Sequence, residues 1–237
     1  MKNLILVTGG NGRFAQTLKK KNNLNFKFLT KKELNILKPE SINRCLVKYK
    51  PKILIHTAGL TRPMHQHETN ITMSIDLNII GTANIVKSCK KYNIKLVYFS
   101  TCYVYDGIKG NHKESEGLNP INNYALSKMG GESSVRMYNN SLVLRIQMTE
   151  QPFPYKKAYS NLYSNYIFHE DIAKILPKLI NKSGIINLGG KSQSVYKFVK
   201  QYNKHIIKTK LNDKKTPLNQ TMNLNKLKKI LKKNVNS

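Results

Sequence analysis

Residues 3–15 read NLILVTGGNGRFA, and this stretch decides the fold class. A short apolar run ends in a turn of glycines, and a helical pattern follows directly. Gly9, Gly12 and Ala15 form a G-x-x-G-x-x-A turn, in which side chains at the first two positions would hold a pyrophosphate away from the backbone. The N-terminus of the following helix presents free N–H groups to phosphates. The stretch therefore predicts the first strand, turn and helix of a dinucleotide-binding domain.

The same strand-and-helix unit repeats along the first half of the chain. Further apolar runs occur at residues 25–30 (NFKFLT), 52–59 (KILIHTAG), 94–101 (IKLVYFST) and 141–146 (SLVLRI). Runs that are apolar on both faces are typical of a parallel sheet covered by helices. We expect the helices at Asn11–Lys21, Pro39–Lys50, Glu68–Tyr92 and Asn122–Tyr138. The pattern predicts an α/β fold with a doubly wound, Rossmann-type parallel sheet and right-handed crossovers.

The pattern becomes irregular after Ile146, where tyrosine, proline and asparagine are frequent. A helix is expected at His169–Asn181, followed by a strand in residues 184–190 (GIINLGG). We therefore expect a dinucleotide-binding domain over residues 1–147. Residues 148–237 are expected to form a smaller lobe that binds the substrate.

The charge of the chain is strongly positive, with 41 Lys and Arg against 12 Asp and Glu and a formal net charge of +29. Such a field attracts polyanions, so nucleic acid is one class of partner to consider. However, lysine, asparagine and isoleucine are abundant throughout the chain, and no nucleic-acid recognition motif with interleaved aromatic residues accompanies them. A nucleic-acid partner is therefore not expected.

Targeting and redox signals favour a soluble cytoplasmic protein. No stretch approaches the roughly 20 apolar residues that cross a bilayer, and the N-terminal apolar run is too short for a signal peptide. Cys45, Cys89 and Cys102 are scattered without C-x-x-C spacing, which argues against a disulfide framework or a zinc site. His65 and His67 form an H-x-H pair without nearby carboxylates, so we interpret them as surface or substrate-rim residues and expect no metal.

The end of the second strand indicates which dinucleotide binds. An acidic residue there would bind the ribose 2′-hydroxyl of NAD. This chain has Thr30, Lys31 and Lys32 at that place and no acid before Glu33. Two cations where a 2′-phosphate would lie favour NADP(H) over NAD(H), with Arg13 as a further phosphate contact. The alternative is that both lysines are ordinary surface residues.

A tyrosine and a lysine lie four residues apart in residues 122–132 (NNYALSKMGGE). On a helix, Tyr124 and Lys128 share one face, although two amphipathic side chains would do so without any chemistry. Ser100 and Thr101 end the fourth strand, and parallel sheets place their ligands at the carboxyl ends of their strands. A hydroxyl from this strand end should therefore face the same crevice as the glycine turn.

The order of these motifs resembles the extended short-chain dehydrogenase/reductase superfamily, and most closely its dTDP-4-dehydrorhamnose reductase family. The likeness rests on the glycine turn, HTAG, NIIGTAN, STCYVYDG and YALSK. It implies that Thr101 binds the substrate carbonyl and that Tyr124 is the acid. It further implies that Lys128 assists the proton transfer and contacts the nicotinamide ribose. It also implies that Asn78 distorts its helix and joins the proton relay.

The chemistry of ketone reduction agrees with these roles. A hydride goes to carbon and a proton to the developing alkoxide. A free phenol, with a pKa of about 10, is a slow acid or base near neutrality, and an ammonium within a few ångströms is expected to favour the phenolate. Thr101 would polarise the carbonyl oxygen and fix its distance from the cofactor.

Three departures from the family bear on substrate binding or activity. The family's aspartate after the threonine is Cys102 here, and an acid after the second strand is replaced by Asn35. Family members are also usually longer. The residues expected to bind the cofactor are Gly9, Gly12, Arg13, Phe14, Thr30, Lys31, Ala58, Gly59, Tyr124 and Lys128. Those expected to bind the substrate are Thr101, Cys102, Tyr103 and Arg145.

The expected activity is NADP(H)-dependent reduction of the C4 ketone of a nucleotide-linked 4-keto-6-deoxysugar. Basic side chains of the C-terminal third would hold its diphosphate, and the candidates are Arg145 and the region of Lys156 and Lys157. Tyrosines would stack on the base or cover the sugar, and the candidates are Tyr155, Tyr159 and Tyr163. Alternatives are a nucleotide-sugar epimerase or dehydratase of the same fold, and a non-catalytic regulatory subunit that binds the cofactor and a partner enzyme. The sequence is also compatible with a homodimer of this chain.

Overall fold

A six-stranded parallel sheet forms the centre of the computed structural model, which describes residues 4–21, 24–213 and 216–233. The strands are ordered β10-β5-β4-β3-β1-β2. Because β2 and β3 lie on opposite sides of β1, the sheet has its topological switch point at the strand that leads into the glycine turn. The expected doubly wound fold is confirmed. The strands are β1 Ile5–Thr8, β2 Phe26–Leu29, β3 Ile53–His56, β4 Lys95–Phe99, β5 Ser141–Ile146 and β10 Gly184–Leu188.

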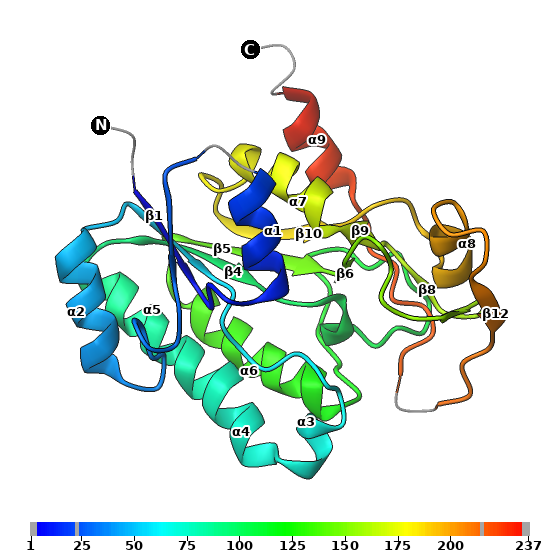
Figure 1. Cartoon of the computed structure of the whole chain (residues 1–237), viewed down its shortest axis with the longest axis horizontal. Coiled ribbons are helices and arrows are strands. Elements are labelled where there is room, and N and C mark those ends of the chain that lie inside the picture. The colour runs from blue at the N-terminus through cyan, green and yellow to red at the C-terminus, as the bar shows by residue number, and fades with distance from the viewer. Residues whose placement is uncertain (1–3, 22–23, 214–215, 234–237) are drawn as a thin grey trace.

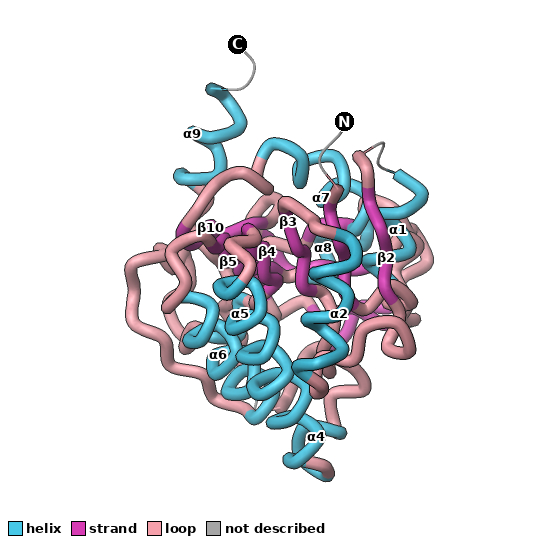
Figure 2. Tube along the Cα trace, turned by 90° about the vertical axis from the view of Figure 1, so that its left-hand side faces the viewer, coloured by secondary structure: helices cyan, strands magenta, loops and turns pink. Residues whose placement is uncertain are grey.

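Helices cover both faces of this sheet (Figures 1 and 2). Helices α1, α7 and α9 lie on one face, and α2, α5 and α6 lie on the other. Alternate strand residues point to opposite faces, so Ile5 and Val7 join the first core and Leu6 joins the second. The helices are α1 Arg13–Lys21, α2 Pro39–Tyr49, α5 Gly81–Lys91, α6 Asn123–Arg136, α7 His169–Ile175 and α9 Asn225–Lys233.

The segment expected as one long helix over Glu68–Tyr92 is divided into several pieces. It contains the end of α3 (Gln66–Thr69), α4 (Ile71–Ile75), a π-helical turn (Asp76–Ile80) and α5. Asn70 separates the first two because its Oδ1 accepts a hydrogen bond from the N–H of Met73 at 3.0 Å and so caps α4. The π-helical turn places Asn78 in its middle.

The helix expected over His169–Asn181 is also shorter. Helix α7 ends at Ile175 and is followed by a 3₁₀ turn, Leu176–Lys178. Pro177 lies in this turn and has no N–H to continue an α-helix.

Short strand pairs and one helix build a second lobe beside the sheet, on the right of Figure 1. Its small core contains Phe168 and Phe198. The strand β10 comes from this later part of the chain and pairs with β5, so the sheet crosses the expected division at residue 147. Residues 1–3 and 234–237 at the ends of the two expected parts lie outside the described residues. The pairs are β6 Met148–Thr149 with β9 Ile167–Phe168, β7 Lys157–Tyr159 with β12 Ile207–Thr209, and β8 Tyr163–Ser164 with β11 Gln193–Ser194, and the helix is α8 Val195–Lys200.

In the part of the chain that the structure describes, no helix has both the length and the apolar character needed to span a bilayer.

Candidate active site

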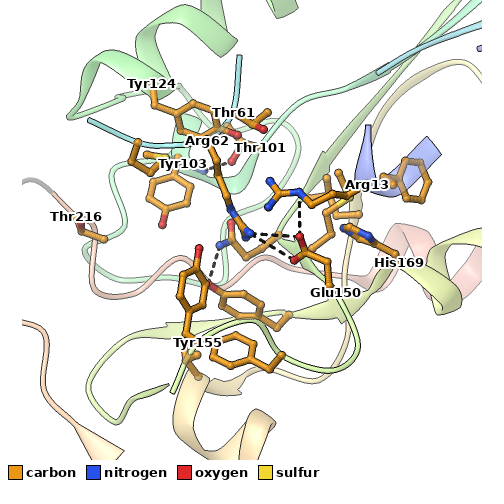
Figure 3. Close-up of a pocket in the computed structure, with 18 of the residues that line it drawn as sticks. Arg13, Thr61, Arg62, Thr101, Tyr103, Tyr124, Glu150, Tyr155, His169 and Thr216 are labelled. Atoms are coloured by element: carbon orange, nitrogen blue, oxygen red, sulfur yellow. Dashed lines mark hydrogen bonds and ion pairs between the residues drawn. The ribbon is translucent and has the colours of Figure 1, made fainter. Parts of the chain in front are cut away.

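A cavity of about 1290 Å³ lies at the carboxyl ends of the strands, between the sheet and the second lobe. The strand ends His56, Phe99 and Ile146 contribute to its floor. Residues from the glycine turn, the loop after β3, helix α6 and the second lobe form its walls, and part of the wall is shown in Figure 3. The location matches the crevice in which open parallel sheets bind ligands.

The glycine turn fits a dinucleotide. Gly9 has φ +66°, and a Cβ on it would lie 2.9 Å from the backbone of Ala58. Only glycine therefore allows the turn and the loop after β3 to approach this closely. The N–H of Gly12 donates to the carbonyl of Gly9 at 2.8 Å and closes the turn just before α1. The expected cofactor residues Gly12, Arg13, Phe14, Ala58 and Gly59 all line the cavity.

Thr101, Tyr124 and Lys128 meet in this cavity, together with Tyr103. Thr101 lies two residues after the end of β4 and directly before a 3₁₀ turn, Cys102–Val104, which it caps by accepting the N–H of Tyr103 at 3.2 Å. Asn122 caps α6 in the same way by accepting the N–H of Ala125 at 2.9 Å. These caps fix the starts of the two elements that carry the hydroxyl and the tyrosine–lysine pair.

The ring of Tyr124 is held between two other rings. His67 packs on it edge to face with 5.0 Å between centroids, and Tyr103 does the same at 5.8 Å. His67 is 1% exposed, and its Nδ1 lies 2.7 Å from the hydroxyl oxygen of Ser74. The interpretation of His67 as a surface or rim residue is therefore wrong, whereas His65 is exposed.

The predicted lowering of the tyrosine's pKa by the lysine is not seen. Burial raises the pKa of Tyr124 to about 12, although a hydrogen bond with Thr101 opposes this shift. Burial also lowers the pKa of Lys128 to about 7, and the charge of Glu132 opposes that shift. The Nζ of Lys128 lies over the ring of Tyr98, 4.3 Å from the ring centroid. Without a strong ionic partner, a buried lysine favours its neutral form.

Arg145 does not reach the cavity, so its expected substrate role is wrong. Its guanidinium is 1% exposed, and its Nη2 donates to Oε1 of Glu132 at 2.6 Å. Nη1 donates to the hydroxyl of Tyr105 at 2.7 Å, and the hydroxyl of Ser100 donates to Glu132 Oε2 at 2.6 Å. A β-strand residue whose side chain is buried in an ion pair between sheet and α6 cannot also hold a ligand.

Cys102 is the second expected substrate residue that the structure corrects. It is 0% exposed and does not line the cavity, and its thiol donates to Oε1 of Gln147 at 3.2 Å. Burial raises its pKa to about 12, so the group is an uncharged thiol at neutral pH. Tyr103, the next residue, does line the cavity.

Asn78 lies in the π-helical turn and joins three segments. Its Nδ2 donates to the carbonyl of Leu60 and to the hydroxyl of Ser127, both at 2.9 Å, and its Oδ1 accepts the N–H of Leu60 at 2.8 Å. A Cβ on Gly131 would lie 2.3 Å from the carbonyl oxygen of Asn78, so the glycine permits α6 to approach the turn. The helix is thus distorted at Asn78, as the resemblance implies, and π-bulges occur frequently at functional sites.

A second cavity of about 870 Å³ lies at the end of β2. Thr30, Lys31 and Lys32 line it, together with Lys38 and Arg44. The carboxylate of Glu33 accepts hydrogen bonds from the N–H and the hydroxyl of Thr30 at 2.8 and 3.0 Å. The first acid after this strand therefore folds back on the strand end.

Several residues of the main cavity were not predicted as site residues, and three of them carry titratable side chains that meet on one side of it. Arg62, Glu150 and His169 all line it, and Glu150 pairs with Arg62 and with Arg13. No local motif marks any of them. Of the predicted lobe residues, Lys156 and Lys157 line the cavity, as do two of the three tyrosines, Tyr155 and Tyr159; Tyr163 does not.

No group of three or more His, Cys, Asp and Glu side chains within the described ranges is arranged to hold a metal ion.

Known proteins with similar sequences carry two kinds of name: enzymes of dTDP-linked sugars, and methionine adenosyltransferase 2 subunit beta, whose Xenopus tropicalis form is 31% identical over 115 residues, 48% of this chain and 34% of that protein. A dTDP-D-glucose 4,6-dehydratase of Dictyostelium discoideum is 32% identical over 171 residues, which cover 67% of this chain and 36% of that protein. A dTDP-4-dehydrorhamnose reductase of Aggregatibacter actinomycetemcomitans is 27% identical over 151 residues, 61% of this chain and 51% of that protein. The matched parts thus span about a third to a half of the length of these relatives.

Solved structures share the fold at lower identity. The dTDP-4-dehydrorhamnose reductase of Bacillus anthracis, solved in complex with NADP, superposes with a TM-score of 0.84 over 96% of this chain and 91% of that one, at 22% identity. The family model described as the RmlD substrate binding domain matches residues 1–149, which carry the glycine turn, Thr101, Tyr124 and Lys128. The chain therefore belongs to the RmlD substrate binding domain family, within the extended short-chain dehydrogenase/reductase superfamily.

Proposed function

We propose that this protein is an NADP(H)-dependent reductase of the C4 ketone of a nucleotide-linked 4-keto-6-deoxysugar. The observation that carries the proposal is that Thr101, Tyr124 and Lys128 line one cavity with the glycine turn. A ketone held there would lie beside both a hydroxyl and a phenol. The relatives named above as acting on dTDP-linked sugars support the substrate class.

Tyr124 is the proton donor in this proposal. With its pKa raised to about 12, it carries its proton at neutral pH and can give it to the developing alkoxide. Thr101, hydrogen-bonded to Tyr124, fixes the position of the substrate oxygen. NADPH, when bound, supplies the hydride.

Lys128 exchanges the proton in this proposal, and Asn78 positions the helix that carries it. The pKa of Lys128, lowered to about 7, lets the amine gain or lose a proton near neutral pH. Asn78 donates to the hydroxyl of Ser127, which in turn donates to the carbonyl of Tyr124 at 2.8 Å. This chain of hydrogen bonds holds the start of α6 in place against the π-helical turn.

The substrate's nucleotide would lie against the second lobe. Lys156 and Lys157 supply positive charge near the cavity, and Tyr155 and Tyr159 supply aromatic faces for a base or a sugar. Tyr155 is further held by the guanidinium of Arg62, which lies 5.5 Å from its ring centroid.

The preference for NADP(H) rests on the second cavity. Lys31, Lys32, Lys38 and Arg44 line it, against one acid, Glu40. A ribose 2′-phosphate would meet four cations there. Glu33, the first acid after the second strand, does not line this cavity and is bonded to Thr30.

The test is incubation of the protein with NADPH and a panel of nucleotide-linked 4-ketosugars, followed at the nicotinamide absorbance. Turnover is expected with at least one of them. Tyr124→Phe should reduce the rate by about 10² to 10⁴, the usual contribution of a general acid. Tyr163→Phe, a tyrosine outside the cavity lining, is the matched control and should leave the rate within twofold. If Tyr124→Phe keeps the rate within a few fold, the mechanism is wrong.

A dehydratase or epimerase is the second candidate, because the Dictyostelium relative bears the name of a dehydratase. Such an enzyme would retain NAD through its cycle. Purified protein that carries bound NAD and converts a nucleotide sugar without consuming added NADPH would favour this function over the reductase.

A further inference from the structure

One carboxylate in the main cavity is shared by two arginines from distant segments (Figure 3). Arg13 is the first residue of α1, and its Nε lies 3.0 Å from Oε1 of Glu150. Arg62 lies in the loop after β3, and its Nη1 lies 3.4 Å from each oxygen of the same carboxylate. Glu150 follows β6 in the second lobe. It therefore joins the dinucleotide-binding part of the molecule to this lobe across the cavity.

The place that Glu150 takes is favourable for an anion. Arg13 begins a nine-residue helix, and the N-terminus of a helix carries partial positive charge. Two guanidiniums contact one carboxylate, so the cluster keeps a net positive charge. Burial alone would raise the pKa of Glu150, but its backbone hydrogen bond and the charges of Arg62 and Arg13 hold it below its ordinary value. The carboxylate is thus ionised at neutral pH.

His169 is a second and independent sign of a ligand at this point. Its ring is 5% exposed, lines the same cavity and packs edge to face on Phe14 with 5.5 Å between centroids. Its buried Nδ1 has no hydrogen-bond partner among the described residues. Buried polar groups without partners are unfavourable, so a ligand in the cavity that reached this nitrogen would gain a hydrogen bond.

We infer that Arg13, Arg62 and His169 form a site for the diphosphate of a bound nucleotide, and that Glu150 is an internal competitor that holds the arginines until the diphosphate displaces it. Guanidiniums bind carboxylate and phosphate oxygens with the same planar fork, so the two anions exclude each other from it. The diphosphate carries more negative charge and offers an acceptor to the histidine.

This inference deepens the proposed function, on which it rests for the class of ligand. The diphosphate has two sources in that reaction, the dinucleotide cofactor and the nucleotide sugar. Because Arg13 is in the glycine turn and Arg62 contacts the ring of Tyr155 in the second lobe, the cluster lies between the regions proposed for the two. Binding experiments with each source alone separate them.

The test measures dissociation constants by calorimetry on the whole chain for NADPH and for thymidine diphosphate, each alone. Glu150→Gln keeps the shape of the side chain and removes the competing charge. We expect it to bind the diphosphate that uses this cluster about fivefold more tightly, in line with the strength of partly exposed ion pairs. Arg62→Gln should weaken the same ligand, and combining it with Glu150→Gln should abolish most of the gain. His169→Phe keeps the ring without its nitrogens and should also weaken binding.

Asp171→Asn is the matched control. It removes one negative charge from helix α7, where Asp171 pairs with Lys174 at 3.2 Å on the surface. If Glu150→Gln binds both ligands no more tightly than this control does, the inference is overturned. Glu150→Asp, which retains the charge on a shorter side chain, should lie between wild type and Glu150→Gln. Because these measurements need no turnover, a protein that binds in this way but reduces no ketosugar would contradict the proposed function and leave the inference standing.

Discussion

The amide nitrogen of Asn78 lies 2.9 Å from the hydroxyl oxygen of Ser127, which ties the π-helical turn to the helix of the tyrosine–lysine pair. Asn78 also makes both hydrogen bonds to Leu60. One buried side chain thus satisfies the backbone N–H and carbonyl of the loop after β3 and also positions α6. The geometry of the site depends on this amide as well as on the groups that face the cavity.

Replacing Asn78 by alanine should therefore affect stability and rate together. The change leaves the N–H and carbonyl of Leu60 without partners, which should lower the free energy of unfolding by about 1–3 kcal/mol. The proposed turnover should fall about tenfold or more, because α6 loses the hydrogen bond between Ser127 and Asn78. Urea unfolding and turnover measurements check this. Asn84→Ala, which removes a single hydrogen bond to the carbonyl of Ile36, is the control and should leave turnover unchanged.

The lowered pKa of Lys128 predicts how stability varies with pH. The folded-state pKa is about 7 against an ordinary value of 10.5, so between these values the unfolded chain binds more protons. The contribution of this residue to stability therefore increases as the pH rises from 7 to 10.5. Lys128→Met should flatten this part of the curve in urea unfolding at successive pH values. Lys174→Met, at an exposed position, should leave the slope as in wild type; an equal effect of both changes would refute the assignment.

The cations of the second cavity predict the cofactor ratio. Lys31→Glu places a negative charge where we propose the 2′-phosphate of NADPH to lie. It should raise the KM for NADPH about tenfold and leave that for NADH unchanged or lower. Lys182→Glu makes the same change of charge at an exposed position outside both cavities. If the ratio of the KM for NADPH to the KM for NADH is the same in Lys31→Glu as in this control, the proposed contact is refuted.

The buried pair of Glu132 and Arg145 should dominate the ionic contribution to stability. Removing one partner of a buried pair leaves an uncompensated charge, so Glu132→Gln should lower the free energy of unfolding by about 3–5 kcal/mol. The exposed pair of Asp171 and Lys174 offers the comparison. Asp171→Asn should change that free energy by less than about 1 kcal/mol. Chemical unfolding of both variants would measure the difference, and equal values would contradict the buried pair's role.

Much of this molecule could be predicted from local patterns. The apolar runs specify the strands, because a strand buried on both faces needs apolar residues at consecutive positions. The glycine turn specifies the first crossover, and the spacing of Tyr124 and Lys128 specifies their common face. The pattern failed where a single residue interrupts a helix, as at Asn70 and Pro177. The capping oxygen of Asn70 and the missing N–H of Pro177 each act over only a few residues. A helical pattern of apolar residues read over a long stretch therefore does not reveal them.

The sequence by itself determined which segments become the main strands and helices and placed Tyr124 and Lys128 on one helix face, since each depends on neighbours within one turn or one strand. Only the tertiary structure decided which charges are ligand sites and which are structural. Arg145 looked available and is buried against Glu132, whereas Glu150 had no motif and receives Arg13 and Arg62 from two other segments. The state of a charged side chain depends on burial and on its partners, and both come from residues far apart in the chain.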